Sequence, residues 1–299
     1  MGNSCIFSCC HNRVNVVDNT INNNSLVKTE NFDMFLYNPL ILGNGYSGNS
    51  YKITMNNHQI TCKKIKKKHF NTGYEEIKIL KEINQDKYLP VFFKAIETDK
   101  SLYIMYEYLD GCDLLQMMRE PTFDINGTNT IAIITKEITL GLYSLFRYNY
   151  IHLDIKFENI IISKTKPIKI KIIDLAFCKK LDQKNHLSEV CGTHGYIPPE
   201  VLLYKRYFHN TDVWSLGVVL YGLFTDNLLF ESTTKNQVSR NQMNNFRNIY
   251  EHSLQIKEID EVAADLIDKM LQKNPSSRIS IKDILKHKFI QDNTSLRYL

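Results

Sequence analysis

Two short isoleucine-rich runs with a turn between them are the feature that most constrains this chain. Residues 160–162 and 168–173 have strand character, and residues 164–167 carry the polar and proline signals of a turn. Asn159 enters the first run and Asp174 leaves the second. In an antiparallel hairpin these two residues lie at the same open end. The pattern therefore predicts a place where two oxygen-bearing side chains meet.

The segment that leads into this hairpin adds charged groups. Asp154 and Lys156 lie just before the first strand. Oxygen ligands beside a lysine suit Mg2+ and phosphate, because Mg2+ is usually held by a few protein oxygens together with substrate phosphates. These residues outline a phosphoryl-transfer site, and the alternative is an acid-bearing turn before an ordinary hairpin.

Residues 152–159 read His-Leu-Asp-Ile-Lys-Phe-Glu-Asn, which resembles the catalytic loop H-R-D-x-x-x-x-N of eukaryotic protein kinases. The resemblance implies that Asp154 accepts the proton of the substrate hydroxyl and that Lys156 neutralises charge on the transferred phosphoryl group. It also implies that Asn159 and Asp174 bind Mg2+, with Mn2+ as a substitute. Asp174 begins Asp-Leu-Ala in the place of D-F-G, and the alanine is expected to stiffen that turn.

A glycine-rich stretch between two predicted strands matches G-x-G-x-x-G. No helix follows it directly, which argues against a dinucleotide-binding fold. A simple glycine hairpin is the alternative. In the kinase family such a hairpin covers the phosphates of ATP. The resemblance therefore implies that four residues bind the nucleotide: Gly43, Asn44, Gly45 and Gly48.

The next strand contains a lysine that resembles the last residue of V-A-I-K. Ile-Thr-Cys-Lys at residues 60–63 places Lys63 in that position, and Lys64 is the alternative one residue later. The resemblance implies that Lys63 holds the α- and β-phosphates of ATP and pairs with Glu76 on the following helix. Lys63 and Asp154 are both expected to act on charge and not to belong to a core.

Residues 102–111 read as a strand that ends at a glycine, and they resemble the hinge between kinase lobes. The resemblance implies that the segment from Glu107 to Leu109 offers backbone groups to adenine and that Asp113 meets the ribose. Tyr106 falls at the gatekeeper position. An edge strand followed by a turn is the alternative.

Residues 192–200 resemble the substrate-docking segment that ends in A-P-E. Thr193 matches the threonine that serine/threonine kinases place against the catalytic acid, which disfavours tyrosine as acceptor. The family pairs Glu200 with Arg278 and uses Asp212 to hold the catalytic loop, and both roles are structural. Kinases of small molecules generally lack this segment.

Two departures from the family pattern concern regulation. Leu153 replaces the arginine that binds an activation-loop phosphate, and Glu189 occupies the usual phosphoacceptor position. We expect activity without loop phosphorylation, with Glu189 as a weaker anchor to some other cation. Phosphorylation of Ser188, one residue out of register, is the alternative.

The remaining patterns predict a large helical part and an overall division into lobes. Apolar residues recur at helical spacing around 77–83, 131–145 and 259–271, the last including Val262, whereas 212–221 is apolar on nearly all sides. The predicted fold is α+β and two-lobed, with a small antiparallel sheet lobe carrying one helix and a large, mainly helical lobe. The predicted ranges are a tail at 1–31, a kinase domain at 32–291 (lobes about 32–109 and 111–291) and a short C-terminal tail at 292–299.

The N-terminal residues predict disorder with one further signal. The tail is rich in asparagine and lacks periodicity. Gly2 resembles an N-myristoylation start, although Ile6 stands where serine or threonine is preferred. Palmitate could be added at Cys5, Cys9 and Cys10. Attachment would need two acyl chains because no polybasic run follows, and an unmodified tail is the alternative.

Composition limits the other classes of protein. The 37 basic and 32 acidic residues leave a net charge of only +5, which does not argue for nucleic-acid binding. No apolar run approaches the roughly 20 residues that span a bilayer. Without a secretory signal, the cysteines are expected to be reduced in the cytoplasm.

The combined prediction is a protein kinase that transfers the γ-phosphoryl group of ATP to serine or threonine of protein substrates. Its main rival is a pseudokinase that binds nucleotide or serves as a scaffold. Inactive members of the family usually lose one of three residues that this chain keeps: Lys63, Asp154 and Asp174.

Overall fold

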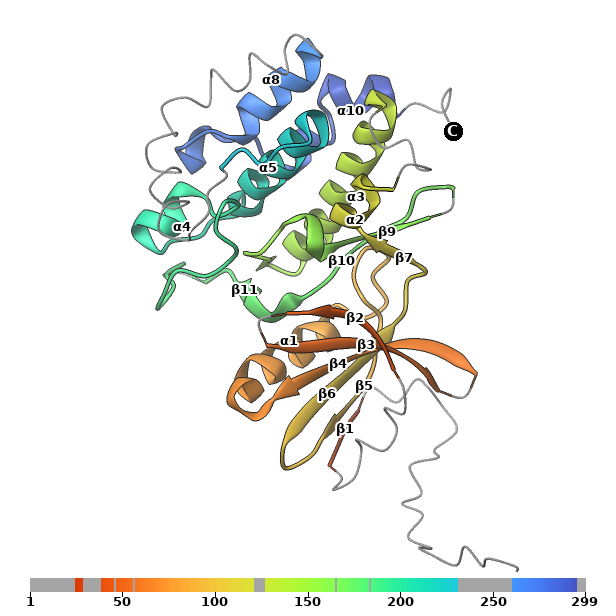
Figure 1. Cartoon of the computed structure of the whole chain (residues 1–299). Coiled ribbons are helices and arrows are strands. Elements are labelled where there is room, and N and C mark those ends of the chain that lie inside the picture. Colours follow the sequence, from red (N-terminus) through yellow and green to blue (C-terminus); the bar gives the residue numbers. More distant parts are fainter. Residues whose placement is uncertain are drawn as a thin grey trace, which may run out of the picture.

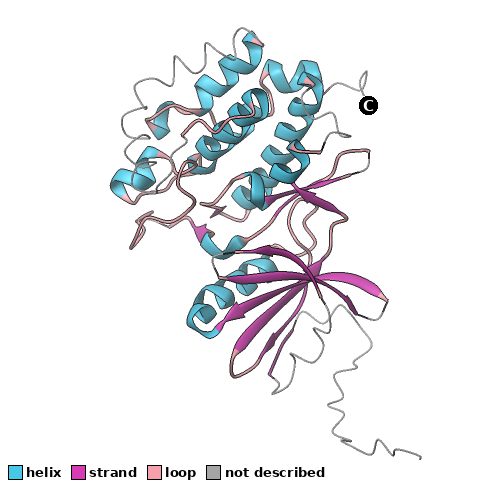
Figure 2. Cartoon of the chain, viewed as in Figure 1, coloured by secondary structure: helices cyan, strands magenta, loops and turns pink. Residues whose placement is uncertain are grey.

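The computed structural model describes residues 25–28, 39–45, 47–55, 57–120, 127–164, 166–182, 184–230 and 260–294. Within them, a lobe made mainly of strands is followed by a lobe made mainly of helices, as the colours of Figure 2 show. The predicted two-lobed α+β fold is confirmed. No helix in these ranges is both long enough and apolar enough to cross a bilayer.

The smaller lobe is a sheet with one α-helix against its face (Figure 1). Its strands are β1 (Ser25–Lys28), β2 (Leu40–Asn44), β3 (Gly48–Met55), β4 (His58–Lys66), β5 (Phe92–Glu97) and β6 (Ser101–Glu107). They lie in the order β1-β5-β6-β4-β3-β2. Helix α1 (Phe70–Glu82) follows a 3-10 turn and buries Ile77, Ile79 and Leu80 in the main core. The helix and the sheet therefore meet through apolar side chains, which fixes the position of the helix.

Strand β1 differs from the sequence expectation. It pairs in parallel with β5, from Ser25 opposite Lys94 to Lys28 opposite Glu97, whereas the other neighbouring strands are antiparallel. The predicted tail at 1–31 is therefore wrong for residues 25–28. A four-residue strand at the edge of a sheet is too short to leave a clear period in the sequence. The four residues singled out for acylation lie outside the described part: Gly2, Cys5, Cys9 and Cys10.

The larger lobe begins with short strands and continues with helices. A three-stranded sheet contains β7 (Gly111–Asp113), β9 (Ile160–Ser163) and β10 (Ile170–Ile172), and a two-stranded one contains β8 (Tyr150–Ile151) and β11 (Lys179–Lys180). The helices are α2 (Leu114–Met118), α3 (Thr128–Arg147), α4 (Pro199–Tyr204), α5 (Thr211–Thr225), α8 (Glu261–Met270), α9 (Ile281–Ile284) and α10 (Lys288–Asn293). The last helix runs two residues past the predicted domain end at 291.

The hairpin predicted from the isoleucine runs is present. Strands β9 and β10 are antiparallel, with Ile160 opposite Ile172. The backbone N–H of Ile173 donates to the carbonyl oxygen of Asn159 at 2.9 Å. Asn159 and Asp174 therefore leave the hairpin at the same end, as expected from the antiparallel ladder.

Within the described residues, the helices that form the core agree with the apolar patterns except at Val262; Ile259 lies outside the described part. Every residue of α5 from Thr211 to Leu223 is buried, and Trp214 stacks on Phe230. Val262, predicted to belong to the apolar face of α8, is 38% exposed. It lies in the first turn of that helix, directly after the N-cap region, where the side chain of Asp260 accepts a hydrogen bond from the backbone of Ala263.

Candidate active site

The lysine of strand β4 lies at the centre of a buried charge cluster. The Lys63 ammonium donates to both carboxylate oxygens of Glu76 at 2.9 and 2.7 Å, and to Oδ1 of Asp174 at 2.7 Å. Lys63 is only 3% exposed. Lys64 lies over the ring of Tyr103, 5.5 Å from its centroid. Because successive side chains of a strand point to opposite faces, the register places Lys63 toward α1 and resolves the choice between the two lysines.

The charges of this cluster stabilise one another. Burial alone would lower the pKa of Lys63, but the carboxylates of Asp174 and Glu76 outweigh it and raise that pKa. Burial would raise the pKa of Asp174, and the adjacent Lys63 ammonium more than compensates and lowers it. Lys63 and Asp174 therefore both stay charged at neutral pH.

The backbone of the catalytic loop is held by one buried carboxylate, that of Asp212. Asp212 accepts hydrogen bonds from the backbone N–H groups of His152 at 2.7 Å and Leu153 at 2.9 Å. Leu153 has a φ of 66°, in the left-handed region that a branched side chain seldom adopts. Two charge-assisted bonds on consecutive amides explain how this conformation is maintained. The structural role expected for Asp212 is thus visible as contacts.

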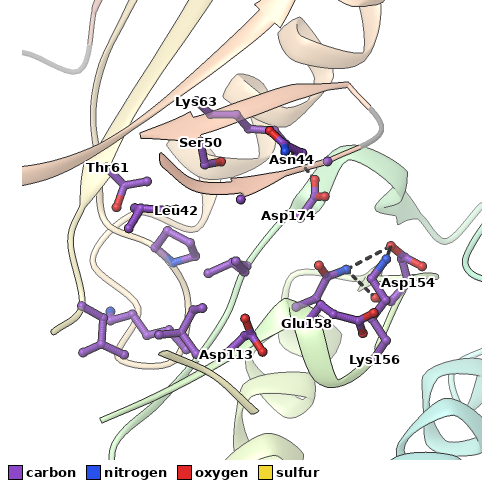
Figure 3. A pocket seen from close by; sticks show the side chains of 18 of the residues that line it. Leu42, Asn44, Ser50, Thr61, Lys63, Asp113, Asp154, Lys156, Glu158 and Asp174 are labelled. Atoms are coloured by element: carbon purple, nitrogen blue, oxygen red, sulfur yellow. Dashed lines mark hydrogen bonds and ion pairs between the residues drawn. The ribbon is translucent and has the colours of Figure 1, made fainter. Parts of the chain in front are cut away.

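The candidate base lies within a compact hydrogen-bond network. The Thr193 hydroxyl donates to Oδ1 of Asp154 at 2.6 Å and accepts from the ammonium of Lys156 at 2.8 Å. The same ammonium is 3.3 Å from Oδ2 of Asp154. The Asn159 amide donates to that oxygen at 3.0 Å and to the Asp154 carbonyl oxygen at 2.8 Å. Dashed lines in Figure 3 mark hydrogen bonds that end on Asp154. The structure therefore brings together four residues that the sequence analysis selected.

The residues present fit a magnesium ion. Both hydrogen bonds of the Asn159 amide use its nitrogen, which leaves Oδ1 as a metal-ligand oxygen. Lys63 binds Oδ1 of Asp174, and no hydrogen bond to Oδ2 of Asp174 involves any of the described residues. One carboxylate oxygen and one amide oxygen are the kind of sparse protein ligand set that Mg2+ uses together with phosphates.

These groups line one cavity of about 850 Å3 between the lobes. Residues of the glycine loop, the hinge and the catalytic loop all line this cavity. In Figure 3, Asp174 and Asp154 lie below the glycine loop, which carries Asn44. The predicted residues on its wall are Gly43, Asn44, Gly45, Gly48, Lys63, Glu107, Leu109, Asp113, Asp154, Lys156, Asn159, Asp174 and Thr193. Glu76 is the exception, because it lies behind Lys63.

The glycine loop needs glycine at one of its three positions. A Cβ at Gly48 would lie 1.8 Å from the carbonyl oxygen of Lys64, whereas nothing lies within 4 Å of a Cβ at Gly43. A Cβ at Gly45 would be 3.5 Å from Oδ2 of Asp174. The loop therefore lies over Asp174, and only Gly48 is required by close packing of strands.

The hinge contains contacts that the sequence analysis did not find. Strand β6 lies between β5 and β4, so the alternative of an edge strand is wrong. The carboxylate of Glu107 forms an ion pair with Lys171, whose ammonium also donates to the Leu89 carbonyl oxygen at 2.8 Å. Asp113 caps α2 by accepting from the backbone of Gln116 at 2.8 Å. The lysines that alternate with isoleucine in residues 168–171 were the sequence signal for the first contact.

The deep wall of the cavity also carries hydroxyl groups. Ser50, Thr61 and Tyr106 line it. Tyr106 is 6% exposed, and its hydroxyl hydrogen-bonds to Ser50. Burial raises the pKa of Tyr106, so this hydroxyl stays protonated. Thr61, which stands in place of the alanine of V-A-I-K, could have been noticed from the motif.

The segment after Asp174 is held by apolar packing. Leu153 is buried in a cluster with residues from this segment and its neighbours: Ile151, Leu181, Leu187, Ile197, Val201 and Tyr207. Within the described residues no ion pair involves Glu189, so the expected anchor between Glu189 and a cation stays a prediction. Lys205 instead donates to the backbone carbonyl of Ser188 at 3.1 Å.

The segment ends at a buried ion pair. Arg278 donates to Glu200 through two nitrogens, at 2.7 and 2.9 Å, and both side chains are nearly inaccessible to solvent. Arg278 also donates to the backbone of Asn210 and Gln272. The pairing expected from the sequence is present, and it connects α4 with the C-terminal helices.

A strand lobe and a helical lobe that enclose the cluster of Lys63, Glu76 and Asp174 define a protein kinase domain. The family model described as the protein kinase domain matches residues 38–290. The chain belongs to the eukaryotic-type serine/threonine protein kinase family.

Individual relatives are distant. The chain is similar to human myosin light chain kinase family member 4, with 27% identity over 258 residues, 85% of this chain and 66% of that protein. It is 28% identical to the serine/threonine-protein kinase unc-51 of Caenorhabditis elegans over 284 residues, 87% of this chain and 32% of that protein. It is 26% identical to serine/threonine-protein kinase 17A of Oryctolagus cuniculus over 225 residues, 73% of this chain and 55% of that protein. The chain thus spans between 32% and 66% of the length of these relatives.

Proposed function

We propose that this protein transfers the γ-phosphoryl group of ATP to serine or threonine residues of protein substrates. The observation that carries the proposal is the set of side chains that line one cavity. The Asp154 carboxylate, bonded to Thr193, and the Asp174 carboxylate, bonded to Lys63, both face it. A base and a metal-binding carboxylate that face the same cavity suit phosphoryl transfer.

Each residue of the network has a role that its contacts support. Asp154 accepts the proton of the substrate hydroxyl, and Lys156 stabilises charge on the transferred group. Lys63, held by Glu76, binds the phosphates of ATP. Asn159 and Asp174 hold Mg2+, or Mn2+ in its place, which when bound neutralises phosphate charge.

The part of the cavity that receives the nucleotide and the part that receives the substrate hydroxyl complete the proposal. The backbone from Glu107 to Leu109 accommodates adenine, Asp113 the ribose, and the glycine loop with Asn44 the phosphates. Thr193 donates a hydrogen bond to the carboxylate of Asp154. A threonine in this position is expected in enzymes that phosphorylate serine or threonine.

The enzyme is active without phosphorylation of its activation segment. Three contacts support this part of the proposal without any phosphate: the Lys63–Glu76 pair, the two amide bonds to Asp212, and the apolar packing of Leu153. The test compares initial rates of phosphatase-treated protein, confirmed unphosphorylated by mass, and of Ser188→Ala. A near-complete loss of activity in both would restore Ser188 as the switch.

The direct test of the activity is Asp154→Asn. Transfer of labelled phosphate to a generic protein substrate should fall by at least about a hundredfold, because an essential proton acceptor is removed. Asp99→Asn makes the same chemical change in an exposed turn of the small lobe and serves as control. A wild-type protein that binds ATP but transfers nothing would favour a pseudokinase scaffold, and full activity of Asp154→Asn would show that the site is misassigned.

A further inference from the structure

A carboxylate at the end of helix α1 is bound by the other lobe. The hydroxyl of Tyr150 donates to Oε2 of Glu82 at 2.7 Å, and the ammonium of Lys180 donates to Oε1 at 2.8 Å. Glu82 is the last residue of α1, the helix that carries Glu76. Both oxygens of one small-lobe carboxylate are thus bound by side chains of the large lobe.

The two donors come from strands that border the catalytic machinery. Tyr150 belongs to β8, which leads directly into His152. Lys180 belongs to β11, which follows Asp174 and is labelled in Figure 1. The two residues are opposite each other in the β8–β11 pair, and the Lys180 ammonium is 5.1 Å from the Tyr150 ring centroid. The contact therefore joins α1 to both the catalytic loop and the activation segment.

The two hydrogen bonds to Glu82 differ in strength because their donors are buried to different extents. The Tyr150 side is protected, because Tyr150 is 4% exposed. The side chains of Lys180 and Glu82 are 54% and 35% exposed, and ion pairs in such surroundings contribute little. The hydrogen bonds from Lys180 and Tyr150 lower the pKa of Glu82, which keeps it a carboxylate at neutral pH. The part-buried bond from Tyr150 is therefore the stronger element of the contact.

We propose that Tyr150 and Glu82 are positioning residues for the phosphoryl-transfer reaction. Their hydrogen bond fixes the C-terminal end of α1 against the strand that enters the catalytic loop. Glu76 lies six residues earlier on the same helix, about 9 Å along its axis. Because a short helix moves as a rigid body, holding its end holds Glu76 at Lys63. This inference rests on the proposed kinase activity and explains how the helix is positioned without a phosphate.

The chain offers a matched control on the same helix. The hydroxyl of Tyr74 donates to Oε2 of Glu97 at 2.8 Å, but Glu97 lies on β5 within the small lobe. Tyr150→Phe and Tyr74→Phe each remove one hydroxyl that is bonded to a glutamate. Only the first breaks a bond between the lobes. Glu82→Gln is the conservative variant, because it keeps an oxygen that accepts from Tyr150, whereas Glu82→Leu removes it.

The measurements are hydrogen exchange of the α1 amides and steady-state kinetics, with Tm as a check on folding. A hydrogen bond to a charged acceptor is worth enough to change a coupled equilibrium by about tenfold. In Tyr150→Phe and Glu82→Leu we expect about tenfold faster exchange of amides 77–82 and a kcat about tenfold lower, with KM for the protein substrate unchanged. Tyr74→Phe and Glu82→Gln should stay within about threefold of wild type.

Two results would overturn the proposal. One is equal behaviour of Tyr150→Phe and Tyr74→Phe in both exchange and kcat. The other is faster exchange in Tyr150→Phe with unchanged kcat, since the bond would then hold the helix without positioning Glu76. Exchange needs no catalysis, so a wild type that transfers no phosphate would contradict the proposed activity while the exchange data still decide whether Tyr150 and Glu82 hold α1.

Discussion

Replacing Lys63 by methionine should destabilise the fold as well as stop catalysis. The Lys63 ammonium touches three carboxylate oxygens, and the side chains of Lys63 and Glu76 are 4% and 3% exposed. Neither Lys63 nor Asp154 belongs to an apolar core cluster, as the sequence predicts, yet both are buried, with Asp154 3% exposed. Methionine keeps much of the length of the side chain but leaves Glu76 and Asp174 without their cation.

The magnitude follows from this burial. Removing one partner of a buried ion pair typically costs about 3–5 kcal/mol, because the other charge remains desolvated. Domains are usually stable by about 5–15 kcal/mol, so Lys63→Met should lose a large fraction of the free energy of unfolding. Adding Glu76→Gln replaces one of the two carboxylates that Lys63→Met leaves without a cation by a neutral amide. The double variant should therefore be more stable than the sum of the single effects predicts, by about 1–3 kcal/mol of coupling energy.

Urea denaturation followed by far-ultraviolet circular dichroism measures these differences. The single tryptophan, Trp214, lies in α5 of the large lobe, so its fluorescence would report the wrong lobe. Lys64→Met is the control, one residue later and on the opposite face of β4. It should change the free energy of unfolding by no more than about 0.5 kcal/mol.

The pH dependence gives a second arm with a defined sign. Without the lysine, burial should raise the pKa of Glu76 and Asp174 above their values in the unfolded chain. A raised folded-state pKa contributes stability at low pH that is lost as the pH rises through it. The destabilisation of Lys63→Met should therefore be smaller at pH 5 than at pH 7.5. Equal unfolding free energies for wild type and Lys63→Met at pH 7.5, or a pH dependence of opposite sign, would refute the reasoning.

Three further predictions address packing, the large lobe and the tail. Gly48→Ala should lower the free energy of unfolding by about 1–3 kcal/mol, because its Cβ would overlap the backbone of β4, and Gly43→Ala should have little effect; equal Tm values would contradict this. Arg278→Met should cost about 3–5 kcal/mol in urea denaturation by stranding the buried Glu200, and Glu200→Gln in the same chain should recover part of the loss; additive effects would argue against the pair. If the N-terminus is doubly acylated, wild type should pellet with membranes and Gly2→Ala should not; equal distribution with no acyl mass on the N-terminal peptide would leave the tail unmodified.

Much of the candidate site could be predicted from the sequence because its parts are close along the chain. Asn159 and Asp174 are joined by one short hairpin, whose antiparallel ladder brings them to the same end. Asp154 and Asn159 are five residues apart, and their hydrogen bonds follow from a single 3-10 turn. Local geometry of this kind leaves its own pattern in the order of residues.

The tertiary structure decided what depends on packing between distant segments. The choice between Lys63 and Lys64 required the face of β4 that meets α1, and the parallel strand β1 required the free edge of β5. Apolar packing around Leu153 holds the segment after Asp174, and within the described residues no ion pair involves Glu189.

The contact at the end of α1 is the clearest case. Glu82 meets residues 68 and 98 positions later in the chain, from two different strands. A tyrosine, a lysine and a glutamate at such separations have no periodicity that distinguishes them from surface residues. Their partnership arises only when the two lobes pack, because the packing brings the end of one helix against the strands that enter and leave the catalytic site.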